Sequence, residues 1–389
     1  MTILYLVATA SLLTQVKSES IEVPEKHPKI DMVLLPGGTV RAGEPARGVI
    51  LAPFRMGVRE VTWADLNAFF RKAPHFKHGD DFMYLTEVAR RENFQDAHPA
   101  VGLTWHTALA YCDWLSKVTG HYFRLPTENE WDYALRGGGE IPASLDEVAW
   151  QKGNAAGMTH PVGTKKANGF GLYDMLGNAA EYALEPHSPP FFSPILRGGS
   201  WGTPAGPNLV AGREPLQEEW VDCDAFRPRS SIWLVGPKPC QGMRLVSVAG
   251  PEDREARDQY RNQVQIQVTE VENQVELKVG RASYRFSRVK GVLQNGGKRD
   301  LIDLEIQIYP LDSKSQPHLT DTEPPVGRLT WGKVWPVLTN SFHDGVHRKP
   351  LAPGEKRSFE GMLPESYDDE NDVPPGKFGA RVTNLRFAQ

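Results

Sequence analysis

Apolar and polar residues alternate along the last third of the chain. The alternation is clearest in Val264–Val268, Val275–Val279 and Leu304–Ile308. A period of two residues is typical of strands with one buried and one solvated face. Asn295–Gly297 supplies a turn between such strands. The pattern therefore predicts an antiparallel β-sandwich over residues 264–389.

The preceding part of the chain shows a different spacing, with short helices among short strands. Apolar residues recur at helical intervals in Trp63–Arg71, and a second helical pattern runs from Trp105 to Gly120. Thr127 followed by Glu130 has the spacing of a capping box, which predicts a short helix starting there. Together with the glycines, prolines and short apolar runs, these signals predict an α+β domain.

The length of the chain indicates the number of domains, and its net charge excludes one class of partner. A chain of 389 residues is longer than one ordinary core accommodates, so two domains are expected. The first is predicted at 31–250 and the β-sandwich at 264–389, joined by a charged linker at 251–263. A net charge of −4 without a basic cluster argues against a nucleic-acid partner.

The amino terminus carries an apolar run, Ile3–Leu13, too short to span a bilayer but of the length found in signal peptides. Val16 and Ser18 suit a cleavage site after Ser18. We therefore expect a signal peptide at 1–18, a linker at 19–30, and a periplasmic or secreted protein. A positive segment before the run is missing, so a misassigned start codon or a buried strand remains the alternative.

The three cysteines are scattered. Cys112 falls on a helical pattern and is expected to be a small buried apolar residue. Cys223 and Cys240 lie in one loop-rich region and are expected to pair only if the compartment is oxidising. No CxxC zinc or redox motif is present.

The segment Gly169–Tyr182 is punctuated by glycines and an Asn, which predicts a tight loop anchored in a core. Asp174 and Glu181 are its only acids, and the carbonyls of Gly177 and Ala179 lie between them. Carboxylate and carbonyl oxygens are the ligands that calcium prefers. One calcium site is therefore a hypothesis for this loop, against the alternative of solvated or hydrogen-bonded acids.

Five stretches, in order, resemble the formylglycine-generating enzyme (sulfatase-modifying factor) family. They are Met32–Gly38, Arg59–Thr62, Val101–Trp105, Phe123–Trp131, and Gly171–Asn178 together with Arg197–Trp201. The resemblance implies a C-type-lectin-like fold for the first domain, with bound calcium. It implies the same calcium ligands: the side chains of Asp174 and Glu181 and the carbonyls of Gly177 and Ala179.

The same resemblance argues against the family's oxidation chemistry. Members that oxidise a sulfatase cysteine bind Cu(I) between two cysteines after the Gly-Gly-Ser turn, and the matching positions here are Thr203 and Asn208. A soft monovalent ion needs thiolates rather than hydroxyls or amides. Ala180 replaces the Trp expected before Glu181. Copper is therefore not expected, and a relocated pair of Cys223 and Cys240 is the remaining route to it.

We therefore expect a divergent, pseudoenzyme member that binds a protein, peptide or glycan in the former substrate groove. Ser200, Trp201, Arg213 and Arg244 are predicted to line or support that groove, with turn capping as the alternative for Ser200 and structural ion pairs as the alternative for both arginines. The competing hypothesis is a metal-dependent oxidoreductase acting on a peptide, a sulfatase cysteine or a siderophore precursor.

Two further groups of residues carry no site prediction. His343 and His347 flank an Asp-Gly pair, which is typical of a surface loop when no further ligand is placed nearby. The acidic run Asp368–Asp372 is interpreted as a solvated turn. The second domain weakly resembles exported bacterial β-sandwich domains, which implies binding or packing rather than catalysis.

Overall fold

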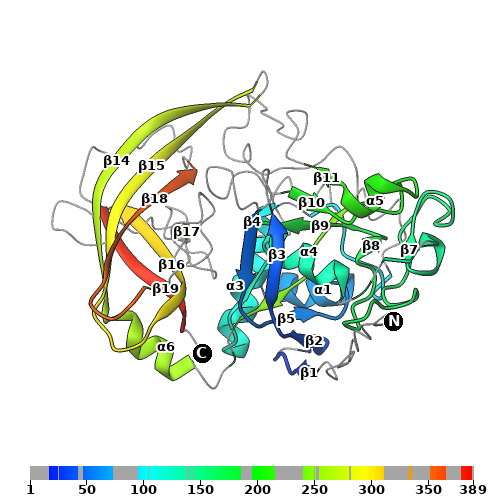
Figure 1. The fold of residues 1–389 in the computed structure, drawn as a ribbon, viewed down its shortest axis with the longest axis horizontal. Helices are drawn as coiled ribbons and strands as arrows, with labels where there is room; N and C mark the ends of the chain where they lie inside the picture. The colour runs from blue at the N-terminus through cyan, green and yellow to red at the C-terminus, as the bar shows by residue number, and fades with distance from the viewer. Residues whose placement is uncertain are drawn as a thin grey trace, which may run out of the picture.

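The computed structural model contains an N-terminal body and a set of C-terminal strands (Figure 1). The residues that it describes are 17–24, 26–42, 47–72, 95–103, 105–137, 139, 141–142, 144–184, 195–214, 240–248, 250, 254–279, 282–310, 333–334, 351–364 and 378–387. Cys223, His343, His347 and the acidic run 368–372 lie outside these residues, as do residues 1–16 of the expected signal peptide.

A five-stranded antiparallel sheet lies at the base of the N-terminal body. Its strands, in spatial order, are β1 (Ser18–Ile21), β2 (Ile30–Leu35), β5 (Phe54–Gly57), β13 (Val246–Ser247) and β6 (Phe123–Arg124). The sheet is covered on both faces, because neighbouring residues of β2 belong to two different apolar clusters, Met32 to one and Val33 to the other. The sheet therefore separates two halves of the core.

Strand β1 lies within the segment that we predicted to be a linker, 19–30. Ser18 pairs with Val33 and Ile21 with Ile30, and the carbonyl of Lys17 accepts a hydrogen bond from the Leu34 amide at 2.9 Å. The linker prediction is therefore wrong for the residues of β1. A cut after Ser18 would also remove the first residue of this strand.

A second sheet and two strand pairs complete the β structure of this body. The sheet has the order β11 (Arg213–Glu214), β10 (Ile195–Arg197), β9 (Ala180–Ala183) and β12 (Gln241–Gly242). The pairs are β3 (Gly38–Ala42) with β4 (Arg47–Leu51), and β7 (Ala149–Trp150) with β8 (Leu176–Gly177). Strands that pair here can come from distant parts of the sequence, as β9 and β12 do.

The described part of the N-terminal body contains the three helices predicted from the sequence and two short ones that were not predicted. The predicted helices are α1 (Trp63–Lys72), α3 (Trp105–Thr119) and α4 (Glu128–Arg136), and the other two are the single-turn 3₁₀ helix η2 (Leu145–Glu147) and α5 (Pro207–Ala211). The capping box at the start of α4 is confirmed, with the Thr127 side chain accepting from the Glu130 amide and the Glu130 carboxylate accepting from the Thr127 amide. The mixed α/β prediction for this part of the chain is confirmed.

The predicted charged linker, 251–263, contains helix α6 (Arg254–Arg261). Two buried side chains explain why this polar segment folds. The Arg257 guanidinium donates to the carbonyls of Gly250 and Gly120, and Tyr260 packs into the C-terminal apolar cluster. The segment predicted as a charged linker is thus helical at Arg254–Arg261, and its role as the boundary between two domains stays a prediction.

The C-terminal part forms two three-stranded antiparallel sheets. The first has the order β14 (Val264–Val279), β15 (Ala282–Asn295) and β18 (Lys356–Pro364). The second has the order β17 (Lys333–Val334), β16 (Leu301–Pro310) and β19 (Phe378–Phe387). The alternating segments of the sequence are therefore strands, and a closed β-sandwich remains a prediction.

Among the described residues, no helix is both long enough and apolar enough to cross a membrane.

Candidate functional site

The loop that we predicted at Gly169–Tyr182 contains the short strand β8 and continues into β9. Asp174 and Asn178 both have left-handed backbone conformations, with φ of 53° and 54°, which suits the tight turns of the loop. At Gly177, with φ of 75°, an added Cβ would lie 2.1 Å from the Trp150 carbonyl oxygen. Only glycine fits there, so the backbone of the loop is held close against β7.

A buried ion pair joins this loop to the end of the N-terminal domain. Arg244 and Glu181 are both 0% exposed, and the Arg244 Nη2 atom lies 2.6 Å from Glu181 Oε1. Arg244 Nε also donates to the carboxylate, at 3.0 Å to Oε1, and Trp131 Nε1 donates to Oε2 at 2.8 Å. Both carboxylate oxygens of Glu181 are therefore bonded.

A second buried acid, Glu60, binds the same loop from the other side. Its carboxylate accepts from the Asn178 side-chain amide at 2.8 Å and from the Ala179 backbone amide at 2.9 Å. Burial, reinforced by the negative charges of Asp174 and Glu181, raises the pKa of Glu60 well above its ordinary value. The loop is thus held by polar groups that are largely removed from water.

Asp174 completes this network. Its Oδ2 atom accepts from the Gly163 amide at 2.6 Å, whereas Oδ1 is buried without a hydrogen-bond partner in the structure. Burial raises the pKa of Asp174, while the Gly163 bond and the charge of Arg244 act in the opposite direction. The network therefore combines three carboxylates with one guanidinium.

The residues predicted to bind calcium fit that ion only in part. The unpartnered Oδ1 of Asp174 suits a cation ligand, but the Glu181 oxygens are already bonded to Arg244 and Trp131. A calcium ion at Glu181 would have to displace a buried guanidinium. Within the described residues, no group of three or more His, Cys, Asp or Glu side chains is arranged to hold a metal ion. The calcium site at Asp174, Gly177, Ala179 and Glu181 stays a prediction, and of its two carboxylates Glu181 is already occupied by Arg244.

The turn after β10 lies against this loop. Gly198 and Gly199 have φ of 82° and 62°, and Ser200 is 5% exposed. The Ser200 amide donates to Thr203 Oγ1 at 3.0 Å, and the Thr203 amide donates back to the Ser200 carbonyl at 2.9 Å. Ser200 is thus mainly a buried turn residue, which is the alternative that the sequence left open.

Trp201 is the half-buried residue of this turn. Its backbone amide donates to the Asn178 carbonyl at 3.0 Å, which fixes the turn on the loop. The indole Nε1 atom is buried and has no hydrogen-bond partner in the structure. Because this nitrogen is buried, only the accessible part of the apolar ring is available to a ligand.

The two positions that correspond to the copper cysteines have other roles. Thr203 Oγ1 caps the turn at Ser200, and Asn208 is exposed on α5. Cys112 and Cys240 are buried in different parts of the fold, Cys112 in α3 and Cys240 beside β12. Cys223 lies outside the described residues, so its pairing with Cys240 stays a prediction.

The two predicted groove arginines differ in position. Arg213 is exposed and its Nε donates to Glu128 Oε1 at 2.9 Å. Arg244 is fully buried, so it supports the loop from below and does not line an accessible groove. The structural ion pair that we gave as the alternative is therefore present for both residues.

Sequence reasoning did not identify Glu60, Trp131 or Asn178 as members of this network. Glu60 lies in the Arg59–Thr62 stretch, and Trp131 ends the Phe123–Trp131 stretch, so both belong to stretches that carried the resemblance. Membership of these stretches was the signal available, because Glu60 lies beside Arg59 and does not stand out by its charge.

The comparisons with known proteins agree with this architecture. Residues 17–247 match the model of the sulfatase-modifying factor enzyme 1-like domain. The chain is 30% identical over 245 residues to the serine/threonine-protein kinase pkn1 of Chlamydia pneumoniae, covering 51% of this chain and 38% of that protein. It is 28% identical to the inactive C-alpha-formylglycine-generating enzyme 2 of Mus musculus, covering 44% and 74%.

Among solved structures, Treponema denticola variable protein 1 aligns with a TM-score of 0.44 at 22% identity, covering 59% of this chain and 98% of that one. The family match spans more than half of the chain and ends just after β13, the last strand of the N-terminal body. The site therefore belongs to a mixed α/β domain whose loop at Gly169–Tyr182 is fixed by a buried ion pair. The chain belongs to the sulfatase-modifying factor family.

Proposed function

We propose that this protein is a divergent member of the family that binds a protein, peptide or glycan partner and lacks copper-dependent formylglycine-generating activity. The observation that carries the proposal is the pair of residues at the copper positions. Thr203 is engaged in capping a turn and Asn208 is an exposed amide, so neither supplies the thiolate that Cu(I) requires.

The turn of Ser200–Thr203 is the proposed binding face. Trp201 is half-buried there, and the Lys152 amide donates to the Thr203 carbonyl at 3.0 Å, which joins the 151–160 loop to the turn. A rigid turn carrying an aromatic side chain loses little conformational entropy on binding, which favours recognition over chemistry.

The proposal includes the finer features expected from the sequence. The N-terminal domain is a C-type-lectin-like fold, the C-terminal strands form a β-sandwich, and the protein is exported. Strand β1 begins at Ser18, so an exported protein that keeps this strand intact is cut before Lys17. Calcium, if bound, uses Asp174 rather than the Glu181 carboxylate.

The decisive experiment measures Cu(I) retention and oxidation of a Cys-x-Pro-x-Arg peptide in the presence of oxygen, with mass spectrometry as the readout. The natural chain is expected to retain no stoichiometric copper and to leave the peptide mass unchanged. The matched control carries Thr203→Cys and Asn208→Cys together, and it is expected to gain Cu(I) binding.

Loss of mass from the peptide cysteine with the natural chain, abolished by Cys223→Ser or Cys240→Ser, would overturn the proposal and support the oxidoreductase hypothesis. Stoichiometric iron or copper in a metal survey of the purified protein would do the same. Binding itself is then measured on peptide and glycan arrays, where Trp201→Ala is expected to lower the signal at least about tenfold.

A further inference from the structure

Strand β1 is the last strand of its sheet. On one side it pairs with β2 through Ser18–Val33, Glu19–Met32, Ser20–Asp31 and Ile21–Ile30. On the other side, no strand of the described part of the chain pairs with it. The outer edge of β1 thus offers unpaired backbone amides and carbonyls, which are a template for an added strand.

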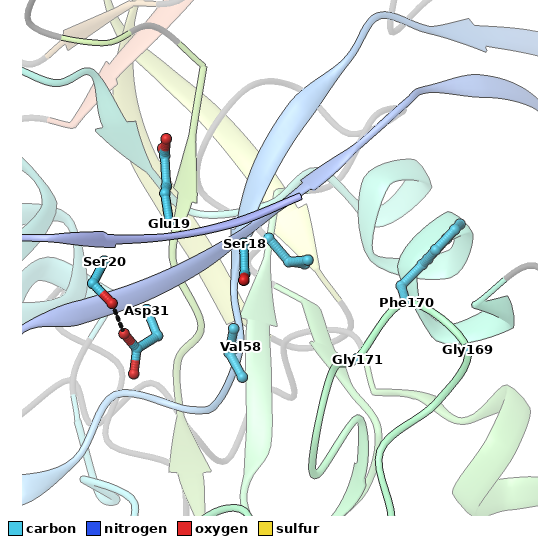
Figure 2. A pocket seen from close by; sticks show the side chains of 9 residues that line it. Ser18, Glu19, Ser20, Asp31, Val58, Gly169, Phe170 and Gly171 are labelled. Atoms are coloured by element: carbon cyan, nitrogen blue, oxygen red, sulfur yellow. Dashed lines mark hydrogen bonds between the residues drawn. The ribbon is translucent and has the colours of Figure 1, made fainter. Parts of the chain in front are cut away.

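A cavity of about 600 Å³ opens beside this edge. Figure 2 shows the residues that line it: Ser18, Glu19, Ser20, Asp31, Val33, Val58, Gly169, Phe170 and Gly171. They come from β1, from β2, from the residue after β5 and from the loop before Leu172. At Gly171 an added Cβ would meet no atom within 4 Å, so the loop does not fill the cavity.

The register of the sheet decides which side chains face the cavity. Residues paired across antiparallel strands project from the same face, so Ser18, Ser20 and Asp31 share one face and Glu19 projects from the other. Figure 2 agrees, with Glu19 directed away from Ser20 and Asp31. The cavity therefore presents two hydroxyls and one carboxylate, with Val58 as an apolar wall.

The charge of Asp31 is not neutralised by an ion pair in the structure. Its Oδ1 atom is hydrogen-bonded to the Ser20 hydroxyl, and no salt bridge to it is formed by the described residues. The cations around it are already engaged, Lys29 with Glu22, Arg55 with Glu19 and Arg59 with Asp65. A carboxylate next to a free strand edge is complementary to a cationic side chain.

We propose that the edge of β1 binds an extended peptide segment of a partner protein, with a Lys or Arg side chain of that segment in the cavity beside Asp31. The backbone of the segment adds a strand to the sheet, and every second side chain of it faces the cavity. The cationic head reaches Asp31 across β1, and the Ser18 and Ser20 hydroxyls accept from it. This surface lies on the first sheet, separate from the turn at Ser200–Thr203.

The test selects short random peptides displayed on phage against the full chain, with Lys or Arg fixed at the centre in one library and Glu in a matched library. Enrichment is expected from the cationic library only. The best peptide is expected to bind about tenfold more weakly to Asp31→Asn, because a charge-assisted hydrogen bond is replaced by a neutral one. Ser18→Trp, which fills the cavity, is expected to abolish binding.

The control is Glu147→Gln, which removes an exposed carboxylate outside the cavity and is expected to leave affinity unchanged. Methylation of alternate backbone amides of the peptide tests strand addition, since a methylated edge cannot pair. Melting temperatures confirm that each variant is folded. The proposal would be overturned if no peptide were enriched, or if the Glu library gave equal enrichment. It would also be overturned if Asp31→Asn left the affinity of the best peptide unchanged.

Discussion

At the scale of single residues, the site depends on charges that water cannot reach. Arg244 and Glu181 form a fully buried pair, and Glu60 and Asp174 add two further acids to the same network. Removing one partner of a buried pair leaves an uncompensated charge in a medium that solvates it poorly. The network therefore makes the conformation of the loop dependent on one guanidinium.

Arg244→Met tests this dependence. We expect a loss of about 3–5 kcal/mol in the free energy of unfolding, because the Glu181 carboxylate remains buried and loses its cation. The control is Lys29→Met, which breaks the exposed pair with Glu22 and is expected to cost less than about 1 kcal/mol. Urea unfolding of both variants, followed by fluorescence, measures the difference. Equal losses would contradict the assignment of Arg244 as the residue that stabilises the loop.

The composition of this network was predictable only in part. Asp174 and Glu181 were identified from their place in a glycine-punctuated loop, and Arg244 was given an ion-pair alternative. The pairing partner could not be read from the sequence, because Arg244 and Glu181 are distant in the chain and meet only through β9 and β12. Glu60 was missed for the same reason, since its contacts to Asn178 and Ala179 are long-range.

At the scale of elements, helices and strands with a strong local sequence signal could be predicted, and those with a weak signal could not. The helix at α4 was predictable because Thr127 and Glu130 satisfy each other's backbone within one turn. Strand β1 and helix α6 were read as linkers because their residues are mostly polar. Both are stabilised by contacts to distant segments, β1 by the pairing with β2 and α6 by the burial of Arg257 and Tyr260.

The connection between β1 and β2 contains a buried histidine that the linker interpretation overlooked. His27 Nδ1 lies 2.5 Å from the Pro28 carbonyl, so it donates there, and Nε2 accepts from the Tyr111 hydroxyl at 2.7 Å. The imidazole also packs against Trp114 of α3, with ring centroids 5.6 Å apart. The neutral imidazole therefore attaches this connection to α3.

Burial lowers the pKa of His27 below its ordinary value of 6.5. Because the folded state prefers the neutral ring, this contribution to stability is present above the unfolded pKa and is lost as pH falls below it toward the folded value. We expect the free energy of unfolding to decrease on acidification below about pH 6.5, and to decrease less in His27→Gln. Urea titrations at a series of pH values measure how steeply the free energy of unfolding changes with pH in the natural chain and in His27→Gln. Identical slopes would show that His27 does not contribute to the acid sensitivity.

At the scale of the whole molecule, α6 contacts both parts of the chain. Figure 1 shows it at the base of the C-terminal strands. The Arg257 Nη2 atom donates to the Gly120 carbonyl at 2.7 Å, and Nη1 donates to Gly250 at 2.8 Å. The Tyr260 hydroxyl donates to the Asn295 side chain at 2.9 Å. A helix with such contacts on both sides restricts the relative movement of the N-terminal body and the C-terminal sheets.

Arg257→Met is the variant that separates these two parts. It keeps much of the buried side-chain volume but removes both guanidinium bonds, and we expect roughly 3 kcal/mol of coupling to be lost. Calorimetry is expected to resolve the single unfolding transition into two, and trypsin is expected to cleave within residues 251–263 at least about tenfold faster.

The control is Arg254→Met on the same helix, whose side chain is 55% exposed and 3.9 Å from Asp258. Both variants remove one tryptic site from this segment, so the rates are compared at the remaining sites. If Arg257→Met and Arg254→Met are cut equally fast, α6 does not couple the two parts, and the proposed binding face at Ser200–Thr203 acts independently of the C-terminal sheets.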